Sequence, residues 1–236
     1  MYHRARAGRH GNPPEVIAAH FAHIASTYRN VLPGDPLAPG RLSVCLSFDD
    51  GYFDFYATVF PLLKKYQLRA VLAVPVAVVR ERVDAASDDR LNLESREAFA
   101  YPSRGGFCTW AELAEMAGSG HVTIAAHGFT HGRLDSPTAN LAMELDAPKT
   151  ILKTRVAQPI DSFVFPFGRC SQRSLQRARA QYRYVFRIGG ALNRGWGSRL
   201  LYRVDADAMP GPRSLFSPAR LVGYRARYFW NRLRMR

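Results

Sequence analysis

Residues 42–76, LSVCLSFDDGYFDFYATVFPLLKKYQLRAVLAVPV, predict a strand, a helix and a second strand in succession. The apolar run LSVCLSF (42–48) predicts a buried strand that ends at the turn Asp49-Asp50-Gly51. Apolar residues at 55, 59, 62, 63 and 66 have the spacing of one helix face, and RAVLAVPV (69–76) predicts the second strand. Two strands joined by a helix in this way lie parallel in one sheet.

The same alternation continues along the rest of the chain. Further strands are predicted at 121–127, 161–168, 183–188 and 201–206, and helices at 15–28, from Thr109 to Met116, from Ser136 onward and at 171–182. Pro148 should interrupt or kink the helix that starts at Ser136. Residues 80–106 are polar and charged, which predicts a long excursion over the surface. Repeated strand–helix order in 236 residues favours a closed or nearly closed β/α barrel over two half-domains.

Composition agrees with one globular domain over residues 1–236, of which 1–40 would form the N-terminal part and 213–236 a basic C-terminal helix. With 47% hydrophobic and 22% charged residues, the chain is neither disordered nor collagen-like. Its three cysteines are too widely spaced for a disulfide framework or a metal knuckle. The sequence contains no apolar run long enough to span a membrane and no apolar signal region at its start. We therefore expect a protein of the cytoplasm or of the inner membrane face.

The net charge of +14 is confined to the last 68 residues. Residues 1–168 contain 17 basic and 17 acidic residues, whereas residues 169–236 contain 16 arginines against Asp205 and Asp207. These arginines could simply solvate a helix face, or they could attract an anionic membrane or a sugar phosphate. The sequence contains no nucleic-acid-binding motif, so we expect no nucleic-acid partner.

Two polar clusters follow predicted strands, Asp49-Asp50-Gly51 after the strand at 42–48 and His127-Gly128-Phe129-Thr130-His131 after the strand at 121–127. The carboxyl ends of barrel strands meet at one edge, where functional residues collect. Two imidazoles and one carboxylate can hold a divalent ion and leave an open position for water, while the second carboxylate accepts a proton. Each cluster alone is also compatible with an ordinary turn or a solvated face.

Three segments resemble signatures of the polysaccharide deacetylases with a NodB-homology domain, a family of carbohydrate esterases. LSFDDGYFDFYATVFPLLKKYQLRAVLAVPV (46–76) resembles the first signature, in which Thr/Ser-Phe-Asp-Asp-Gly precedes a helix and a strand. SGHVTIAAHGFTH (119–131) is similar to the second signature, and FVFPFG (163–168) to a degenerate third one. MYHR, GGALNR and LYRVD also resemble segments of smaller family members, so that the resemblance extends over nearly the whole chain.

The resemblance implies a distorted (β/α) barrel of about seven mostly parallel strands and metal-dependent removal of acetyl from an N-acetylated sugar. Position by position, it makes Asp49 the catalytic base and Asp50, His127 and His131 the metal ligands. The ion would be Zn²⁺, with Co²⁺ or Ni²⁺ as alternatives. The backbone N–H of Phe167 would help to hold the oxyanion. The substrate could be a polysaccharide, an oligosaccharide or a lipid-linked glycan.

The chain departs from the family pattern where an arginine normally braces the base, because that position is Val164. A carboxylate beside a metal ligand still benefits from a cation that keeps it ionised and oriented. Arg203 lies in LYRVD, near the end of a late predicted strand. We therefore predict that Arg203 points into the cleft and pairs with Asp49.

The family's general acid is a second departure, since no histidine follows His131 in this chain. His3 and His121 are the unplaced histidines near matched segments, and His121 would lie at the start of its strand, the wrong end. His10, His20 and His23 are interpreted as tail and helix-surface residues. Without an assigned acid, a catalytically impaired carbohydrate-binding member of the same fold remains the alternative function.

Overall fold

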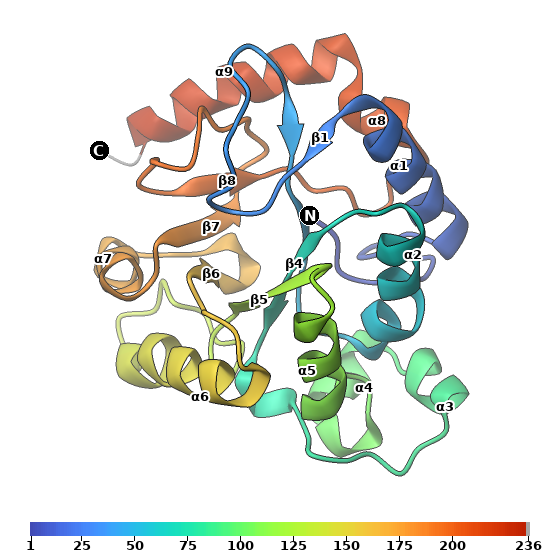
Figure 1. The fold of residues 1–236 in the computed structure, drawn as a ribbon. Coiled ribbons are helices and arrows are strands. Elements are labelled where there is room, and N and C mark those ends of the chain that lie inside the picture. Colours follow the sequence, from blue (N-terminus) through green and yellow to red (C-terminus); the bar gives the residue numbers. More distant parts are fainter. Residues whose placement is uncertain (235–236) are drawn as a thin grey trace.

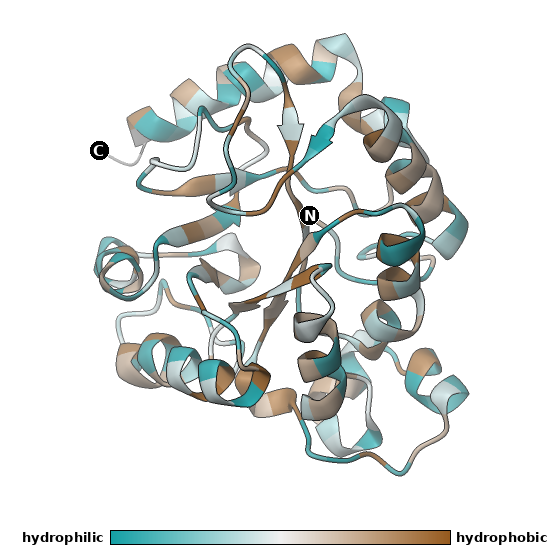
Figure 2. Cartoon of the chain, in the orientation of Figure 1, coloured by the Kyte–Doolittle hydropathy of each residue, from teal (hydrophilic) through white to brown (hydrophobic). Residues whose placement is uncertain are grey.

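A curved sheet of six parallel strands forms the centre of the computed structural model, which describes residues 1–234 (Figure 1). In spatial order, which is also chain order, the strands are β3 (Leu46–Phe48), β4 (Ala70–Val74), β5 (Val122–Ala126), β6 (Ser162–Val164), β7 (Tyr184–Ile188) and β8 (Leu201–Arg203). The expected barrel is confirmed, with six strands in the curled sheet rather than about seven. Apolar residues concentrate on these central strands (Figure 2).

The strand expected over 42–48 is two short strands. β2 (Ser43–Val44) pairs in parallel with β1 (Arg29–Asn30), whereas β3 pairs with β4, so the chain changes sheets at Cys45. The six-stranded sheet consequently has two edges, β3 and β8, that are not paired with each other. We call the space between these two edges the seam.

Residues 1 and 2 bridge the seam at the carboxyl ends of the strands. The Tyr2 N–H donates to the Ser47 carbonyl, and the Tyr2 carbonyl accepts from the Asp49 N–H, both at 2.9 Å. On the other side, the Met1 carbonyl accepts from the Ala206 N–H at 2.9 Å. The N-terminal segment therefore acts as a short extra strand between β3 and β8.

Helices surround the sheet and cover its outer face (Figure 1). α5 and α7 begin with capping boxes, in which the N-cap side chain and the side chain three residues later each bond the other's backbone N–H. The α-helices are α1 (Pro14–Thr27), α2 (Phe60–Lys65), α3 (Ser87–Asn92), α4 (Ser95–Ala100), α5 (Trp110–Gly118), α6 (Ala147–Val156), α7 (Gln172–Gln181), α8 (Pro212–Phe216) and α9 (Pro218–Arg234). None of these described helices has the length and apolar character needed to cross a membrane.

Two π-helical turns precede α2 and α6, at Phe55–Val59 and Ala142–Asp146. In both places a proline, Pro61 or Pro148, is the second residue of the α-helix that follows. Proline cannot donate the i→i−4 hydrogen bond and its ring crowds that carbonyl, so the wider turn accommodates it. The interruption expected at Pro148 is thus a π turn. The helix begins near residue 142, and the prediction that it starts at Ser136 is wrong.

Residues 80–106 are not a loose excursion. They contain α3, α4 and a 3₁₀ turn at Pro102–Arg104, and Leu93 and Ala98 are buried against Tyr52 and Phe107. The charged composition of the segment suggested exposure, but one of its charged residues is buried. Arg90 binds Glu112 through two hydrogen bonds of 2.7 and 2.9 Å. The segment covers one side of the barrel mouth.

The C-terminal basic segment is two helices rather than the single one expected over 213–236. α8 and α9 are separated at Ser217, because the following Pro218 disfavours helical backbone in the residue before it. Residues 235 and 236 lie outside the described residues. α9 packs Tyr224 and Tyr228 inward, where both side chains are buried.

Candidate metal centre and active site

The candidate site lies at the carboxyl ends of four strands. Asp49 and Asp50 follow β3, His127 follows β5, Phe167 lies in the turn after β6, and Arg203 is the last residue of β8. Since neighbouring parallel strands end at the same edge, segments far apart in sequence converge there. The structure thus brings together the side chains that the sequence singled out.

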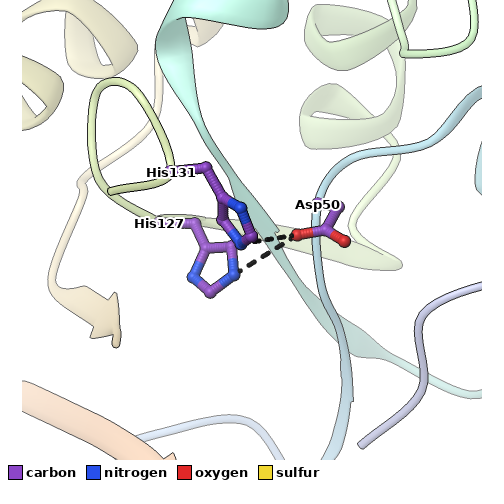
Figure 3. A group of neighbouring side chains, drawn as sticks. All are labelled: Asp50, His127 and His131. Carbon is purple, nitrogen blue, oxygen red and sulfur yellow. Dashed lines mark ion pairs between the residues drawn. The ribbon is translucent and has the colours of Figure 1, made fainter. Parts of the chain in front are cut away.

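Asp50, His127 and His131 form a three-residue cluster whose ligand atoms all lie within 4.8 Å of one another (Figure 3). Asp50 Oδ1 is 3.4 Å from His127 Nε2 and 3.1 Å from His131 Nε2. Two ligands bound to zinc at about 2.0–2.1 Å and at the tetrahedral angle lie about 3.3–3.4 Å apart. Asp50 Oδ1 is buried and forms no hydrogen bond within the described residues, so it is available to a cation.

His127 has the tautomer that a metal ligand requires. Its Nδ1 is 2.8 Å from the Val164 carbonyl, which can only accept, so Nδ1 carries the proton. The lone pair is then on Nε2, the atom that faces Asp50. Burial alone would raise the pKa of Asp50, but the adjacent imidazoles of His127 and His131 hold it well below its ordinary value. An ionised carboxylate and an imidazole lone pair fit a divalent cation.

Glu144 holds the loop that carries both histidines. Its buried carboxylate accepts hydrogen bonds from the N–H groups of Phe129 (2.9 Å) and Thr130 (3.2 Å) and from the Thr130 hydroxyl. At Gly128, where φ is +80°, a Cβ would lie 2.8 Å from Glu144 Oε2, so the close approach requires glycine. Sequence reasoning missed Glu144. The available signal was an acidic residue on the helix face that also presents Leu141 and Leu145.

Three of the candidate site residues have left-handed backbone conformations. The φ values are 72° at Asp50, 63° at His131 and 57° at Phe167. Non-glycine residues adopt this region only when surrounding contacts impose it, and such residues cluster at functional sites. The backbone therefore positions these groups at an energetic cost.

Asp49 and Arg203 form a buried, bidentate ion pair, as the sequence led us to expect. Arg203 donates to the two carboxylate oxygens of Asp49 at 2.5 and 2.8 Å and to the Ser47 hydroxyl at 3.3 Å. Burial raises the pKa of Asp49, but the charge and hydrogen bonds of Arg203, together with His127 and His3, outweigh burial and lower it to about 2. Val164, which occupies the family's arginine position, is buried in the barrel interior instead.

His3 lies beside the same carboxylate. Its Nε2 is 3.8 Å from Asp49 Oδ2, and its Nδ1 is 2.5 Å from Asp207 Oδ2. Burial lowers the pKa of His3, but the hydrogen bond to Asp207 and the charge of Asp49 outweigh it and raise the pKa to about 9. The neighbouring Arg4 anchors the segment through a buried ion pair of 2.6 Å with Asp54. His3 is therefore a charged imidazole at the mouth of the site.

The other histidines lie away from the metal cluster. His121, at the opposite end of β5, binds the Leu68 carbonyl through Nδ1 at 2.8 Å, which agrees with a structural role. The interpretation of His20 as a helix-surface residue is wrong, because it is fully buried and its Nδ1 is 3.1 Å from the Tyr2 hydroxyl. α1 presents His20 on the same face as Ile17, Phe21 and Ile24.

Two aromatic rings enclose His131. Phe99, from α4, stacks on it with ring centroids 4.9 Å apart, and Phe167 lies at 4.6 Å. Phe167 is 56% exposed, and no described hydrogen bond uses its backbone N–H, which leaves that donor available to a ligand. The sequence did not indicate Phe99 as a site residue, because it lies in the segment that was expected to be a surface excursion.

Comparisons with known proteins agree with this geometry. Residues 38–185 match the family model for polysaccharide deacetylase. A poly-β-1,6-N-acetyl-D-glucosamine N-deacetylase of Escherichia coli K12 is 39% identical over 111 residues, which cover 45% of this chain but only 14% of that protein. The matched region is thus a small part of that longer relative.

Solved structures of deacetylases share the fold. IcaB from Ammonifex degensii aligns with a TM-score of 0.70 at 20% identity and covers 88% of this chain and 90% of its own. The Streptococcus pyogenes deacetylase PplD, solved in complex with acetate, aligns with a TM-score of 0.71 at 21% identity, covering 91% and 94%. Because the family match spans more than half of the residues and includes both the Asp-Asp-Gly and the His-x-x-x-His segments, the chain belongs to the polysaccharide deacetylase family.

Proposed function

We propose that this chain is a metal-dependent carbohydrate N-deacetylase, which removes acetyl from an N-acetylated sugar in a polysaccharide, an oligosaccharide or a lipid-linked glycan. The observation that carries the proposal is the buried Asp50, His127 and His131 cluster beside Asp49, a carboxylate held ionised by Arg203. The name of the Escherichia coli relative, a deacetylase of N-acetylglucosamine polymers, supports this substrate class.

Asp50, His127 and His131 would hold the cation, Zn²⁺, and the same donors would also suit Co²⁺ or Ni²⁺. When bound, the ion would supply a Lewis acid that polarises the amide carbonyl and acidifies the attacking water. Asp49 takes the proton of that water, and Arg203 keeps Asp49 ionised and fixes the direction of its oxygens.

The N–H of Phe167 donates to the oxygen that becomes negative as the carbonyl is attacked. His3 gives its proton to the departing amine, for which its position 3.8 Å from Asp49 and its raised pKa are suited. Asp207 fixes the ring of His3 through Nδ1, so that Nε2 presents the proton to the site. His3 would thereby act as the general acid, a role for which the chain has no histidine after His131.

The alternative of a catalytically impaired carbohydrate-binding protein rested on two residues of the family pattern that this chain lacks at the usual positions, the bracing arginine and the acidic histidine. In the folded chain, Arg203 pairs with Asp49 and His3 lies beside the same carboxylate, which supports a brace and a proton donor there. A sugar-binding protein needs neither an ionised base nor a charged imidazole beside an ion site. These contacts favour the enzyme.

Acetate release from N-acetylglucosamine oligomers, β-1,6-linked ones included, tests the proposed activity. We expect release by the purified chain, its loss in a chelator and its recovery when Zn²⁺, Co²⁺ or Ni²⁺ is restored. Recovery by one ion but not by the others would identify the preferred metal. Release that persists unchanged in the chelator would contradict a metal-dependent mechanism.

Replacement of His3 by Gln should reduce acetate release by about 10²-fold and remove the basic limb of its pH profile. The acid must be protonated, and its pKa of about 9 means that activity falls as the pH rises toward 9. A bound cation would shift this limb to a lower pH. Since the folded-state pKa exceeds the ordinary value, the charged His3 stabilises the fold at low pH and loses that contribution as the pH rises through 9. An unchanged basic limb in His3→Gln would exclude His3 as the acid.

We further propose that α9 places the enzyme on an anionic membrane surface. Val222, Phe229, Trp230 and Leu233 are 52–63% exposed and recur at the spacing of one helix face. Exposed arginines, among them Arg225, flank this stripe, and Figure 2 shows the mixed hydropathy along α9. An amphipathic helix with a basic polar face suits a lipid interface. Tyr224 and Tyr228 are buried against the barrel and do not belong to this stripe.

Sedimentation with vesicles tests this surface. We expect binding to phosphatidylglycerol vesicles at low salt, weaker binding as salt rises, and little binding to phosphatidylcholine vesicles. Phe229→Ser combined with Leu233→Ser should weaken binding by roughly tenfold or more. Tyr101→Ser, which alters a similarly exposed aromatic residue on another element, is the matched control. Equal sedimentation with both vesicle types would refute an electrostatic membrane site.

A further inference from the structure

A cavity of about 830 Å³ lies in the seam of the barrel, behind the ion pair of the candidate active site. It is lined by the segment between β1 and β2, by β3 and β8, and by α9, which runs across this side of the molecule (Figure 1). Its volume falls within the roughly 300–1,000 Å³ of small-molecule sites. The cavity is open to solvent on one side, so it is a pocket that a ligand can enter.

The walls of the seam cavity are mainly hydrocarbon and aromatic. Val71 and Phe186 contribute from the barrel interior, Leu46 from β3, and Leu221 from α9. Trp196 lies on the same wall and fixes its ring by donating from Nε1 to the Asp35 carbonyl at 2.9 Å. Such a surface favours an apolar chain over a sugar.

Three lining residues carry buried polar atoms that have no hydrogen-bond partner in the described part of the chain. These atoms are Ser43 Oγ, Arg203 Nε and the Tyr224 hydroxyl oxygen. The residues Arg203 and Tyr224 are each only 6% exposed. Buried polar groups are nearly always paired, so these three atoms beside a single cavity need a partner that the described residues do not supply.

The mouth of the cavity is basic. Among its lining residues, Arg41, Arg194 and Arg225 are exposed, and no acidic residue lines the described cavity. The Arg194 guanidinium lies over the Phe229 ring, 4.8 Å from its centroid, which holds this charge at the edge of the apolar wall. An apolar interior with cations at its entrance complements a hydrocarbon chain that ends in an anionic group.

We propose that the seam cavity binds the hydrocarbon chain of an anionic single-chain lipid, with its phosphate or carboxylate on Arg41, Arg194 and Arg225. The chain lies against Val71, Phe186 and Trp196, and polar atoms near its head reach Ser43 and Tyr224. Both a fatty acid derivative and a prenyl phosphate have this chemistry. The site shares Phe229 and Arg225 with the exposed face of α9. It requires no deacetylase activity.

Quenching of Trp196 by 9,10-dibromostearate tests the site, because bromine quenches an indole only near contact. We expect saturable quenching below the concentration at which the lipid aggregates. Trp196→Phe should remove most of it, whereas Trp230→Phe, on the exposed stripe, should leave it intact. Competition by palmitoyl lysophosphatidate or by farnesyl phosphate distinguishes an acyl from a prenyl ligand, and inorganic phosphate should not compete.

Two sets of variants test where the anionic group of the lipid binds and whether the Tyr224 hydroxyl contacts it. Arg194→Ala combined with Arg225→Ala should raise the half-saturating lipid concentration at least tenfold, and Arg179→Ala on α7 is the charge-matched control. Tyr224→Phe, which removes only an unpaired oxygen, should raise that concentration about threefold to tenfold without impairing folding. His131→Ala, which is expected to be inactive and alters no residue of the cavity wall, should bind lipid normally, which separates this proposal from the proposed reaction. Absence of saturable quenching, or its loss in Trp230→Phe, would overturn the seam site.

Discussion

Replacement of His131 by Ala is expected to abolish acetate release and to lower metal affinity by at least roughly 10²-fold, since even the loss of a group that only supports a metal ligand costs 10–100-fold. Two protein ligands would remain, and Asp50 Oδ1 would lose the closer of its two imidazole neighbours, at 3.1 Å. Metal content after dialysis, measured by atomic emission on the same sample that is assayed for acetate, gives the result.

His121→Ala is the matched control for this experiment. His121 lies just before β5, at the end opposite to the loop that carries His131, and its described side-chain hydrogen bond is to the Leu68 carbonyl. It should keep both metal and turnover and lose only a little stability. Full metal occupancy in His131→Ala, with or without activity, would show that the cluster is not the metal site.

Asp49→Asn is expected to reduce acetate release by about 10²–10⁴-fold while leaving metal content unchanged. The amide has nearly the same shape, but it cannot accept the proton of the attacking water. It also leaves the buried Arg203 guanidinium without its counter-charge, so the free energy of unfolding should fall by as much as about 3–5 kcal/mol. Urea unfolding, metal analysis and the acetate assay on one preparation separate these effects.

The pH dependence of stability provides a second check on Asp49. Its pKa is lowered to about 2 in the folded chain, so the pair with Arg203 stabilises the fold fully above pH 4 and loses this contribution as the pH falls toward 2. Asp49→Asn should remove that acid-sensitive portion. Near-normal acetate release by a folded Asp49→Asn protein would show that another group is the base.

The sequence was sufficient for the parts of the molecule that depend on local pattern. Apolar runs and helical spacing located β4, β5, β7 and α7, and the strand–helix alternation indicated a parallel barrel. The Asp-Asp-Gly and His-x-x-x-His motifs could be placed together because the carboxyl ends of parallel strands lie at one edge, and the family resemblance then singled out Asp50, His127 and His131 as ligands. Arg203 could be paired with Asp49 because a buried carboxylate needs a cation and the usual position held Val164.

Features that arise from tertiary contacts were not accessible from local pattern. Nothing around His3 indicates that residues 49 and 207 will lie beside it, since the contacts form only when the barrel closes. Phe99 and Arg90 lie in a segment whose charged composition suggests exposure. Its packing depends on contacts with distant residues, Arg90 with Glu112 and Phe99 with His131. Glu144 acts mainly through the backbone N–H groups of Phe129 and Thr130, and the sequence offers only an acidic residue on an otherwise apolar helix face as a sign of it.

The bridging of the seam by residues 1 and 2 has a consequence for the order in which the site can assemble during folding. The three candidate metal ligands come from residues 50–131, on β3 and just beyond β5, separated only by β4. The groups that would move protons are contacts between residues far apart in sequence: His3 contacts Asp207 across 204 positions, and Asp49 contacts Arg203 across 154. Long loops close slowly, so contacts between distant residues form late. We infer that a folding chain gains the ability to hold an ion before it gains the ability to turn over substrate.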